Sequence, residues 1–332
     1  MSFSPRRRTW ITGKGSSHTR ISTHHSNLGV LPSCGSSVRH SAKIRQPIHK
    51  FIKFDKVFPP QSTTVKSFSE ISQFVQSSLD GFNVCVFAYG QTGSGKTWTM
   101  SHKDDGMIPL SINKIFSDIK ELMEKGWEYT VDGQFVEIYN ESIVDLLGEG
   151  SKTTRPEIKH DVIARKTIIT NCTIVRLESQ AHAIVILEKA NQNRSTASTM
   201  SNIRSSRSHS AFILNIRGTH RMSGQSCDGT LNLVDLAGSE RVSDSKERDK
   251  RLKETQAINR SLSSLGTVID RLGSGQGHVP YRDSKLTYLL QHSLGGDSKT
   301  LMFANISPDA RNFNETINSL RFAAKVNSTC LH

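Results

Sequence analysis

The chain has 332 residues, of which 35% are hydrophobic and 22% are charged, and this is long enough for one large α/β domain or two ordinary domains. No stretch has the unbroken apolar length of a membrane span, so no membrane association is expected. The net charge of +13 is uneven: residues 1–54 hold ten Lys and Arg and no acid, whereas the remaining residues carry 33 bases and 30 acids. The folded part is therefore only mildly basic, and no nucleic acid partner is expected.

Residues 1–49 are rich in Ser, Arg, His and Thr and show little apolar periodicity. This composition is typical of a disordered basic arm, which is the favoured interpretation. Because the segment is rich in Arg and Ser and lacks acids, a mitochondrial transit peptide is the alternative. The five cysteines show no CxxC spacing, which favours reduced thiols in a cytoplasmic protein over a zinc site or disulfides.

From Phe51 onward, strand-like and helix-like patterns alternate. Strands are expected at 51–58, 83–90, 231–234 and 298–308, and helices at 67–81, 254–272 and 314–328. The stretch 134–147 is interpreted as a strand that runs into a short helix. Such alternation predicts an α/β fold in which a mostly central sheet carries helices on both faces, and residues 50–329 are assigned to one domain.

The segment GQTGSGKT, residues 90–97, fits the phosphate-binding P-loop pattern and follows the buried strand at 83–90. The glycines of the loop allow backbone N–H groups to surround phosphate oxygens, Lys96 would reach the β- and γ-phosphates, and Thr97 would place its hydroxyl on Mg²⁺. A glycine-rich turn without a ligand is the alternative. The predicted nucleotide-binding residues are Gly90, Gln91, Thr92, Gly93, Ser94, Gly95, Lys96, Thr97 and Trp98.

Two further segments suit a nucleotide site. Asp235 follows the apolar residues 231–234, where it would hold the hydrated metal, and Gly238 lies three residues later, where its N–H could approach the γ-phosphate. An Asp that only caps a turn is the alternative. The polar run NIRSSRSHS, residues 202–210, can supply groups to the metal and to the attacking water.

Together, GQTGSGKT (90–97), NxxSSRSH (202–209) and DLAGSE (235–240) resemble the nucleotide loop and the two switches of a kinesin motor domain. The segments YRDSKLTYLLQHSLGG (281–296) and NETINSLRFAAKV (314–326) are similar to kinesin sequences as well, and the resemblance runs from about Phe51 to Asn327. It is greatest to the minus-end-directed kinesins that carry the motor at the C-terminus. The resemblance implies the kinesin motor fold, a P-loop NTPase, with ATP and Mg²⁺ as ligands.

The resemblance also implies roles for individual residues. Asn202, Ser205 and Ser206 would contact the γ-phosphate, the metal shell and the attacking water, and Trp98 would lie beside the adenine. Arg207 would pair with Glu240 to close the switches, and Gly238 would sense the γ-phosphate. The predicted catalytic residues are Asn202, Ser205, Ser206, Arg207, Gly238 and Glu240, and the predicted metal site comprises Thr97, Ser206 and Asp235.

By the same resemblance the partner is the microtubule, and the helix at 254–272 would couple the switches to it. Tubulin is acidic, so basic residues are the contact candidates; the alternative for each is a solvated side chain. The candidates are Lys246, Arg248, Lys250, Arg251, Arg260, Arg282 and Lys285. A location on cytoplasmic or spindle microtubules, or in the nucleus, and dimerisation through a coiled coil outside this chain are further expectations.

The sequence departs from the family pattern at its start. Kinesin motors normally begin with a strand that carries Arg-x-Arg-Pro, and no such run occurs here; SPRRRTW (4–10) has similar residues in another order. The first strand of the sheet is therefore expected to be missing. Three functions remain in view: a microtubule-stimulated ATPase motor, a catalytically impaired microtubule-binding subunit, and an unrelated P-loop GTPase or ATPase, which the two switch segments disfavour.

Overall fold

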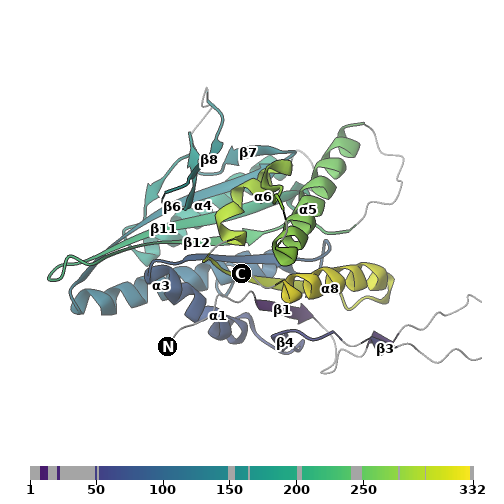
Figure 1. The fold of residues 1–332 in the computed structure, drawn as a ribbon, viewed down its shortest axis with the longest axis horizontal. Coiled ribbons are helices and arrows are strands. Elements are labelled where there is room, and N and C mark those ends of the chain that lie inside the picture. The colour runs from purple at the N-terminus through teal and green to yellow at the C-terminus, as the bar shows by residue number, and fades with distance from the viewer. Residues whose placement is uncertain are drawn as a thin grey trace, which may run out of the picture.

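The structure is a computed structural model that describes residues 8–13, 21–22, 49–50, 52–148, 154–163, 165–199, 204–240, 249–275, 277–295 and 297–329. Its centre is a nine-stranded sheet in the order β10-β6-β11-β12-β5-β13-β1-β4, with β7 paired to β6 (Figure 1). The strands are β1 (Arg8–Gly13), β4 (Lys56–Phe58), β5 (Asn83–Tyr89), β6 (Trp127–Tyr139), β7 (Ser142–Asp145), β10 (Val175–Arg176), β11 (Ser208–His220), β12 (Ser226–Asp235) and β13 (Lys299–Ile306).

The sheet is mixed. Strands β12, β5, β13, β1 and β4 run parallel to one another, whereas β6, β11 and β12 form antiparallel pairs. Because the parallel strands end at the same edge, the loops after β5, β12 and β13 lie together. Two small antiparallel pairs stand apart from the sheet: β2 (Ile21–Ser22) with β3 (His49–Lys50), and β8 (Glu157–Asp161) with β9 (Lys166–Thr170).

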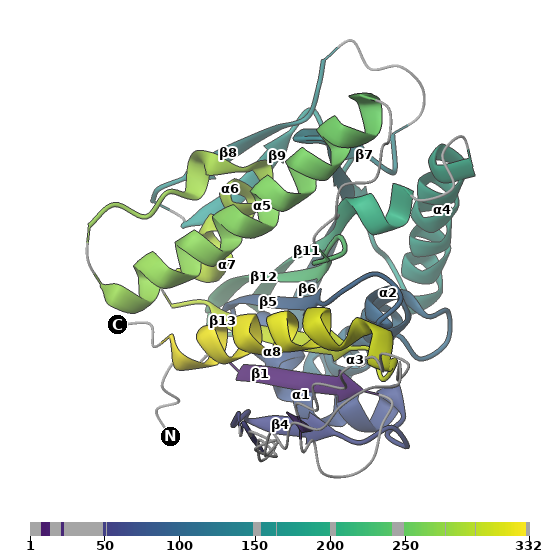
Figure 2. The same cartoon turned by 90° about the vertical axis from the view of Figure 1, so that its right-hand side faces the viewer.

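Helices cover both faces of the sheet, as Figure 2 shows. One face packs against α1 (Thr64–Leu79), α2 (Lys96–Ser101), α3 (Met107–Glu124) and α4 (Gln180–Thr199). The other packs against α5 (Asp249–Ser274), α6 (Lys285–Leu289), α7 (Gln291–Leu294) and α8 (Phe313–Ser328). Short 3₁₀ turns are η1 (Arg204–Arg207), η2 (Tyr281–Asp283) and η3 (Ala310–Asn312). In the described residues, no helix combines the length and apolar character needed to cross a membrane.

Strand β5 shows why the central strands read as continuous apolar runs. Val84, Val86 and Ala88 belong to the core on the face of α1 and α3, whereas Cys85 and Phe87 belong to the core on the face of α5 and α8. Successive side chains of a strand point to opposite faces, so a strand covered on both sides is apolar at every position. The expected α/β architecture with helices on both faces is confirmed.

The N-terminal segment supplies a strand to the sheet, although the first strand was expected to be missing. Strand β1 pairs in parallel with β13 from Arg8 opposite Leu301 to Gly13 opposite Ile306, and its other edge pairs with β4. The expectation that the first strand is missing is therefore wrong, because TWIT within 8–13 supplies β-branched and aromatic residues that favour a strand. It also means that part of the segment expected to be disordered, 1–49, lies in the sheet.

Two other expectations need correction. Within the described part of the expected strand 51–58, which is residues 52–58, only Lys56–Phe58 is a strand. The short helix expected within 134–147 is wrong: β6 and β7 form a hairpin whose turn is Asn140-Glu141, with Tyr139 paired to Ser142. Both turn residues have positive φ, 49° and 57°, as a type I′ turn requires, and the usual Asn-Gly signal is absent from the sequence.

Candidate nucleotide site and switch segments

The loop between β5 and α2 has the backbone of a phosphate-binding loop. Gly90, Gly93 and Gly95 have φ of 153°, 79° and 98°, a region that side chains rarely adopt. At Gly90 a Cβ atom would lie 2.0 Å from the carbonyl oxygen of Asn305, so only glycine fits against β13. The loop can thus turn its N–H groups toward one centre, as an anion site requires.

Lys96 is the cation of this loop and is only 7% exposed. Its Nζ donates hydrogen bonds to the carbonyl oxygens of Gly90 (2.8 Å) and Gln91 (2.9 Å). Burial lowers the pKa of Lys96, an effect that the carboxylates of Asp235 and Glu240 oppose. A buried ammonium group held against a turn of N–H groups is a site for an anion, and the phosphates of a nucleotide match its charge.

Two residues of the predicted metal site, Thr97 and Asp235, lie side by side. The Thr97 hydroxyl donates to Asp235 Oδ2 at 2.7 Å, which joins the start of α2 to the end of β12. The other oxygen, Asp235 Oδ1, is buried and has no hydrogen-bond partner among the described residues. No cluster of three or more His, Cys, Asp and Glu exists in the described part of the chain, so a metal here would take most of its ligands from phosphate and water. Mg²⁺ binds in that way, and these residues fit it.

A buried arginine that the sequence reasoning missed supports Asp235. Arg194 on α4 is 7% exposed; its Nη1 lies 3.3 Å from Asp235 Oδ2 and its Nε lies 3.7 Å from Glu137 Oε1. Glu137 on β6 is completely buried. A regular apolar spacing marks core positions, but an arginine amid ANQNRSTAST carries no such signal.

The two switch segments touch each other and the P-loop. The N–H of Gly238 donates to the Ser206 carbonyl at 2.8 Å, and the N–H of Ser239 donates to the Gly90 carbonyl at 3.0 Å. Glu240 accepts from the N–H of Thr92 at 2.8 Å and also from the Thr92 hydroxyl. A Cβ at Gly238 would lie 2.3 Å from Glu240 Oε2, so a side chain at this position would displace the Glu240 carboxylate from its place beside Thr92.

The expected pair between Arg207 and Glu240 does not occur in this structure. Arg207 Nη1 lies 2.9 Å from Glu254 Oε2 on α5, and Glu254 also accepts from the Tyr139 hydroxyl. Glu240 is hydrogen-bonded to Thr92, and the Arg207 guanidinium is instead paired with the Glu254 carboxylate on α5. The two carboxylates thus serve different partners here.

Several predicted residues lie outside this geometry. Asn202, Lys246 and Arg248 fall outside the described residues. Ser205 lies in η1, and Lys250 and Arg251 lie in the first turn of α5, but only their backbone is described. Their roles stay predictions.

A cavity of about 570 Å³ lies beside the loop, between the start of α1 and the end of β13. Its lining includes Gly95, Trp98, Pro60 and Pro308. Trp98 is 62% exposed, and its ring packs against His102 with centroids 3.9 Å apart. The cavity therefore has the P-loop as one wall and an aromatic ring at its side, an arrangement that suits a nucleotide.

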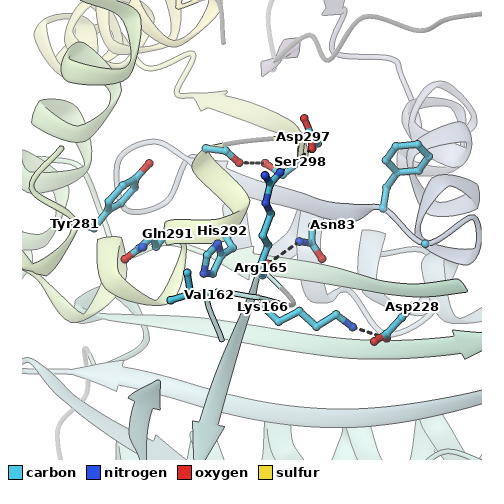
Figure 3. A pocket seen from close by; sticks show the side chains of 13 residues that line it. Asn83, Val162, Arg165, Lys166, Asp228, Tyr281, Gln291, His292, Asp297 and Ser298 are labelled. Carbon is cyan, nitrogen blue, oxygen red and sulfur yellow. Dashed lines mark hydrogen bonds and ion pairs between the residues drawn. The ribbon is translucent and has the colours of Figure 1, made fainter. Parts of the chain in front are cut away.

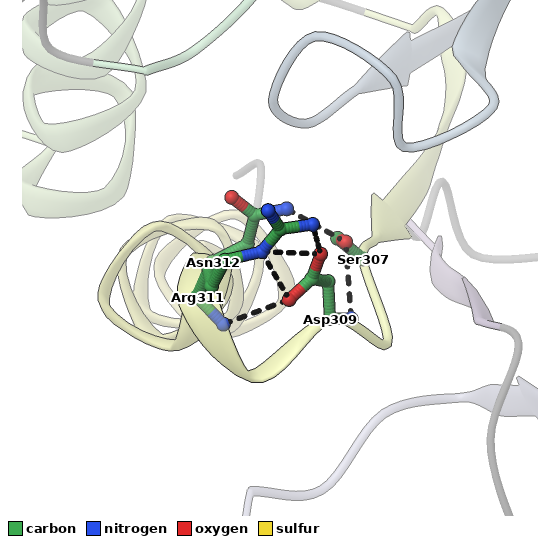
Figure 4. Close-up of polar contacts among 4 residues, drawn as sticks. All are labelled: Ser307, Asp309, Arg311 and Asn312. Atoms are coloured by element: carbon green, nitrogen blue, oxygen red, sulfur yellow. Dashed lines mark hydrogen bonds and ion pairs between the residues drawn. The ribbon is translucent and has the colours of Figure 1, made fainter.

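The loop after β13 borders this cavity and is held by its own contacts (Figure 4). Asp309 accepts from Arg311 through the N–H at 2.9 Å and through Nη2 at 2.6 Å. Asn312 Nδ2 donates to the Ser307 hydroxyl at 3.0 Å. These contacts fix the turn from β13 into α8.

A second cavity, of about 650 Å³, lies at the opposite end of β5 (Figure 3). Arg165 forms an ion pair with Asp297 at 3.1 Å, and Lys166 pairs with Asp228. Its cations are thus balanced by carboxylates, and no predicted site residue lines it. It lacks the phosphate-binding features of the first cavity.

Three predicted microtubule contacts lie on neighbouring elements. Arg260 on α5 is exposed, and its Nε donates to the Asp283 carbonyl at 3.0 Å. Arg282 and Lys285 are exposed on η2 and α6, and the Arg282 guanidinium lies 5.7 Å from the Tyr288 ring centre. The structure therefore brings these cations to one side of α5.

A P-loop joined to two switch segments defines a nucleotide-binding protein of the P-loop class. The sequence matches the kinesin motor domain family over residues 12–329. It is 54% identical over 315 residues to the kinesin-like protein KAR3 of Saccharomyces cerevisiae, covering 92% of this chain and 42% of that protein. It is 55% identical over 282 residues to kinesin-like protein 2 of Schizosaccharomyces pombe, covering 83% and 34%.

The fold agrees with a solved motor. The structure of the C-terminal motor and motor homology domain of Kar3Vik1, fused to a synthetic heterodimeric coiled coil, matches with a TM-score of 0.82 and 49% identity over 97% of this chain and 85% of that one. The chain belongs to the kinesin motor domain family. It spans less than half the length of these two curated relatives.

Proposed function

We propose that this chain is an ATP-hydrolysing microtubule motor domain whose movement is directed to the minus end. The observation that carries the proposal is the contact of Gly238 with Ser206 while Ser239 contacts the P-loop at Gly90. A phosphate bound in the loop can act on both switches at once, because they share these hydrogen bonds. The match to the kinesin motor domain family supports the filament, and the likeness to the C-terminal motor of Kar3Vik1, together with the sequence resemblance to minus-end-directed kinesins, supports the direction.

In this proposal Lys96 neutralises the transferred phosphoryl group, and Thr97 and Asp235 hold Mg²⁺, which supplies charge stabilisation at the phosphates when bound. Hydrolysis needs positioning more than a covalent step. Closure of the switches requires Arg207 to exchange Glu254 for Glu240, which brings the guanidinium toward the loop and leaves Glu254 on α5 without that cation. The exchange therefore removes the ion pair that joins Arg207 to α5.

The filament partner is proposed from charge and position. Arg260, Arg282 and Lys285 lie exposed around α5, the helix that Arg207 contacts through Glu254. Tubulin is acidic, so these cations would contribute an attraction that weakens with salt. A location on cytoplasmic or spindle microtubules follows from that partner, and a dimer through a coiled coil outside this chain is proposed from the Kar3Vik1 relative.

The test is steady-state ATP hydrolysis by the purified chain with and without microtubules. We expect stimulation of at least about tenfold at saturating microtubules. Lys96→Ala is expected to reduce turnover by about 100-fold or more, because it removes a preorganised charge at the phosphates. The matched control is Lys120→Ala on exposed α3, which should behave like the unsubstituted chain.

The second candidate, a catalytically impaired microtubule-binding subunit, predicts tight binding without turnover. Absence of stimulation, together with the same microtubule affinity in ADP and in a non-hydrolysable ATP analogue, would refute the motor. Stimulated turnover would refute the impaired subunit.

A further inference from the structure

A buried histidine joins the second switch to α5. His209, the second residue of β11, is 3% exposed. Its Nδ1 accepts a hydrogen bond from the N–H of Ala237 at 3.0 Å, and its Nε2 lies 2.8 Å from the Ser261 hydroxyl on α5. Ser261 is 1% exposed, and its hydroxyl in turn donates to the Ile258 carbonyl at 2.8 Å.

The direction of this chain of hydrogen bonds is fixed. Burial, with smaller effects from Arg194 and Lys96, lowers the pKa of His209 to about 3, so the ring is neutral. Because Nδ1 accepts from Ala237, the single ring proton sits on Nε2 and is donated to Ser261. Nδ1 therefore acts as the acceptor and Nε2 as the donor, and rotation of the His209 ring would break the hydrogen bonds to both Ala237 and Ser261.

The position of the ring gives this chain its significance. Ala237 precedes Gly238, whose N–H holds the first switch at Ser206. His209 itself is the last residue of that switch segment, NxxSSRSH (202–209), and the second residue of β11. The ring therefore belongs to the first switch segment and is hydrogen-bonded both to the second switch segment, at Ala237, and to α5, at Ser261.

We infer that His209 is a positioning residue that transmits displacement of the Ala237–Gly238 backbone to α5 through Ser261. The inference rests on the proposed motor function. A backbone shift at Ala237 cannot be taken up by solvent, because both the ring and the hydroxyl are buried; it must be taken up by α5 or break the chain. As a consequence, the affinity of the motor for the microtubule changes with the bound nucleotide.

A purely structural role makes a different prediction. A histidine that only fills space would affect stability, and its loss would not change the ratio of microtubule affinities between nucleotide states. Ser261→Ala removes one hydroxyl and replaces no residue of the P-loop or of either switch segment. His209→Asn keeps an acceptor near the position of Nδ1 and loses the reach to Ser261.

The experiment measures microtubule dissociation constants by co-sedimentation, in ADP and in a non-hydrolysable ATP analogue. For the unsubstituted chain we expect a ratio of at least about tenfold, in the range of ordinary coupling between sites. Ser261→Ala and His209→Asn should each lower that ratio by about fivefold, as loss of one buried hydrogen bond implies. Ser261→Ala should leave ATP hydrolysis without microtubules unchanged. Ser264→Ala, a buried serine one turn further along α5, is the matched control and should keep the full ratio.

The outcomes separate the two ideas. If the unsubstituted chain shows equal affinities in both nucleotides, the proposed function fails and this inference fails with it. Suppose that the unsubstituted chain shows the expected ratio of dissociation constants. If Ser261→Ala then keeps that ratio, or if Ser264→Ala lowers it as much as Ser261→Ala does, the motor function stands and the role of His209 is overturned. Thermal unfolding of Ser261→Ala near that of the unsubstituted chain confirms that the comparison is made on folded protein.

Discussion

The partner exchange of Arg207 gives a prediction with two opposite signs. In this structure the guanidinium is bonded to Glu254 at 2.9 Å, and the side chains are only 17% and 19% exposed. Glu254→Gln keeps an acceptor but removes its charge. A hydrogen bond to a charged group contributes about 1.5–3 kcal/mol and a neutral one about 1 kcal/mol, so the substitution destabilises the present pairing by roughly 1 kcal/mol. This favours exchange to Glu240 by about fivefold.

Glu240→Gln acts in the other direction. It weakens the acceptor that the closed switches would use, and it also weakens the bonds to Thr92 that hold Glu240 in this structure. The charged pair with Arg207 outweighs the bonds to neutral Thr92, so closure should become harder.

The assay is the affinity for a fluorescent non-hydrolysable ATP analogue relative to ADP, measured by titration without microtubules. Glu254→Gln should raise this relative affinity by about fivefold, and Glu240→Gln should lower it. Affinity for ADP alone serves as the control, since ADP carries no γ-phosphate to close the switches. A shift of both variants in the same direction, or none in Glu254→Gln, would show that the two carboxylates do not compete for Arg207.

Three further predictions follow from burial and charge. Arg194→Ala should destabilise the fold by about 3–5 kcal/mol in urea unfolding, because it removes a cation from buried Glu137 and Asp235; a loss under 1 kcal/mol would contradict that role. The pKa of His209 is about 3 in the folded protein and near 6.5 in the unfolded chain, so its contribution to stability is full above pH 6.5 and declines as the pH falls toward 3. When the free energy of unfolding is measured at several pH values, His209→Asn should make this decline smaller. Lys285→Ala removes an exposed ammonium but keeps the backbone bond to Glu141, so it should weaken microtubule binding by about twofold to fivefold and reduce its salt dependence, and unchanged binding at low salt would exclude that contact.

The sequence predicts the parts of this molecule that local chemistry determines. Strand β5 is apolar at every position, and the glycines of the P-loop follow it at a spacing that only one kind of site needs. Asp235 ends an apolar strand, so its place beside Thr97 could be expected.

Long-range pairings could not be predicted in the same way. Strand β1 is far from β13 in sequence, and no local pattern states which strand it joins. Arg207 and Glu254 are 47 residues apart, and no local pattern states which carboxylate the guanidinium meets. The hairpin turn at Asn140 was missed because its second residue is Glu141 rather than glycine.

The placement of β1 has a practical consequence for anyone who shortens this protein. A chain that starts at residue 50 would retain the P-loop, both switches and α5, yet it would lose β1, the strand that lies between β13 and β4. Strand β13 would then become an edge strand, and the N–H and C=O groups along one of its sides would lack hydrogen-bond partners. Such an edge can pair with strands of other molecules and so promotes aggregation. Insolubility of the shortened chain would therefore report a missing neighbour rather than a damaged nucleotide pocket.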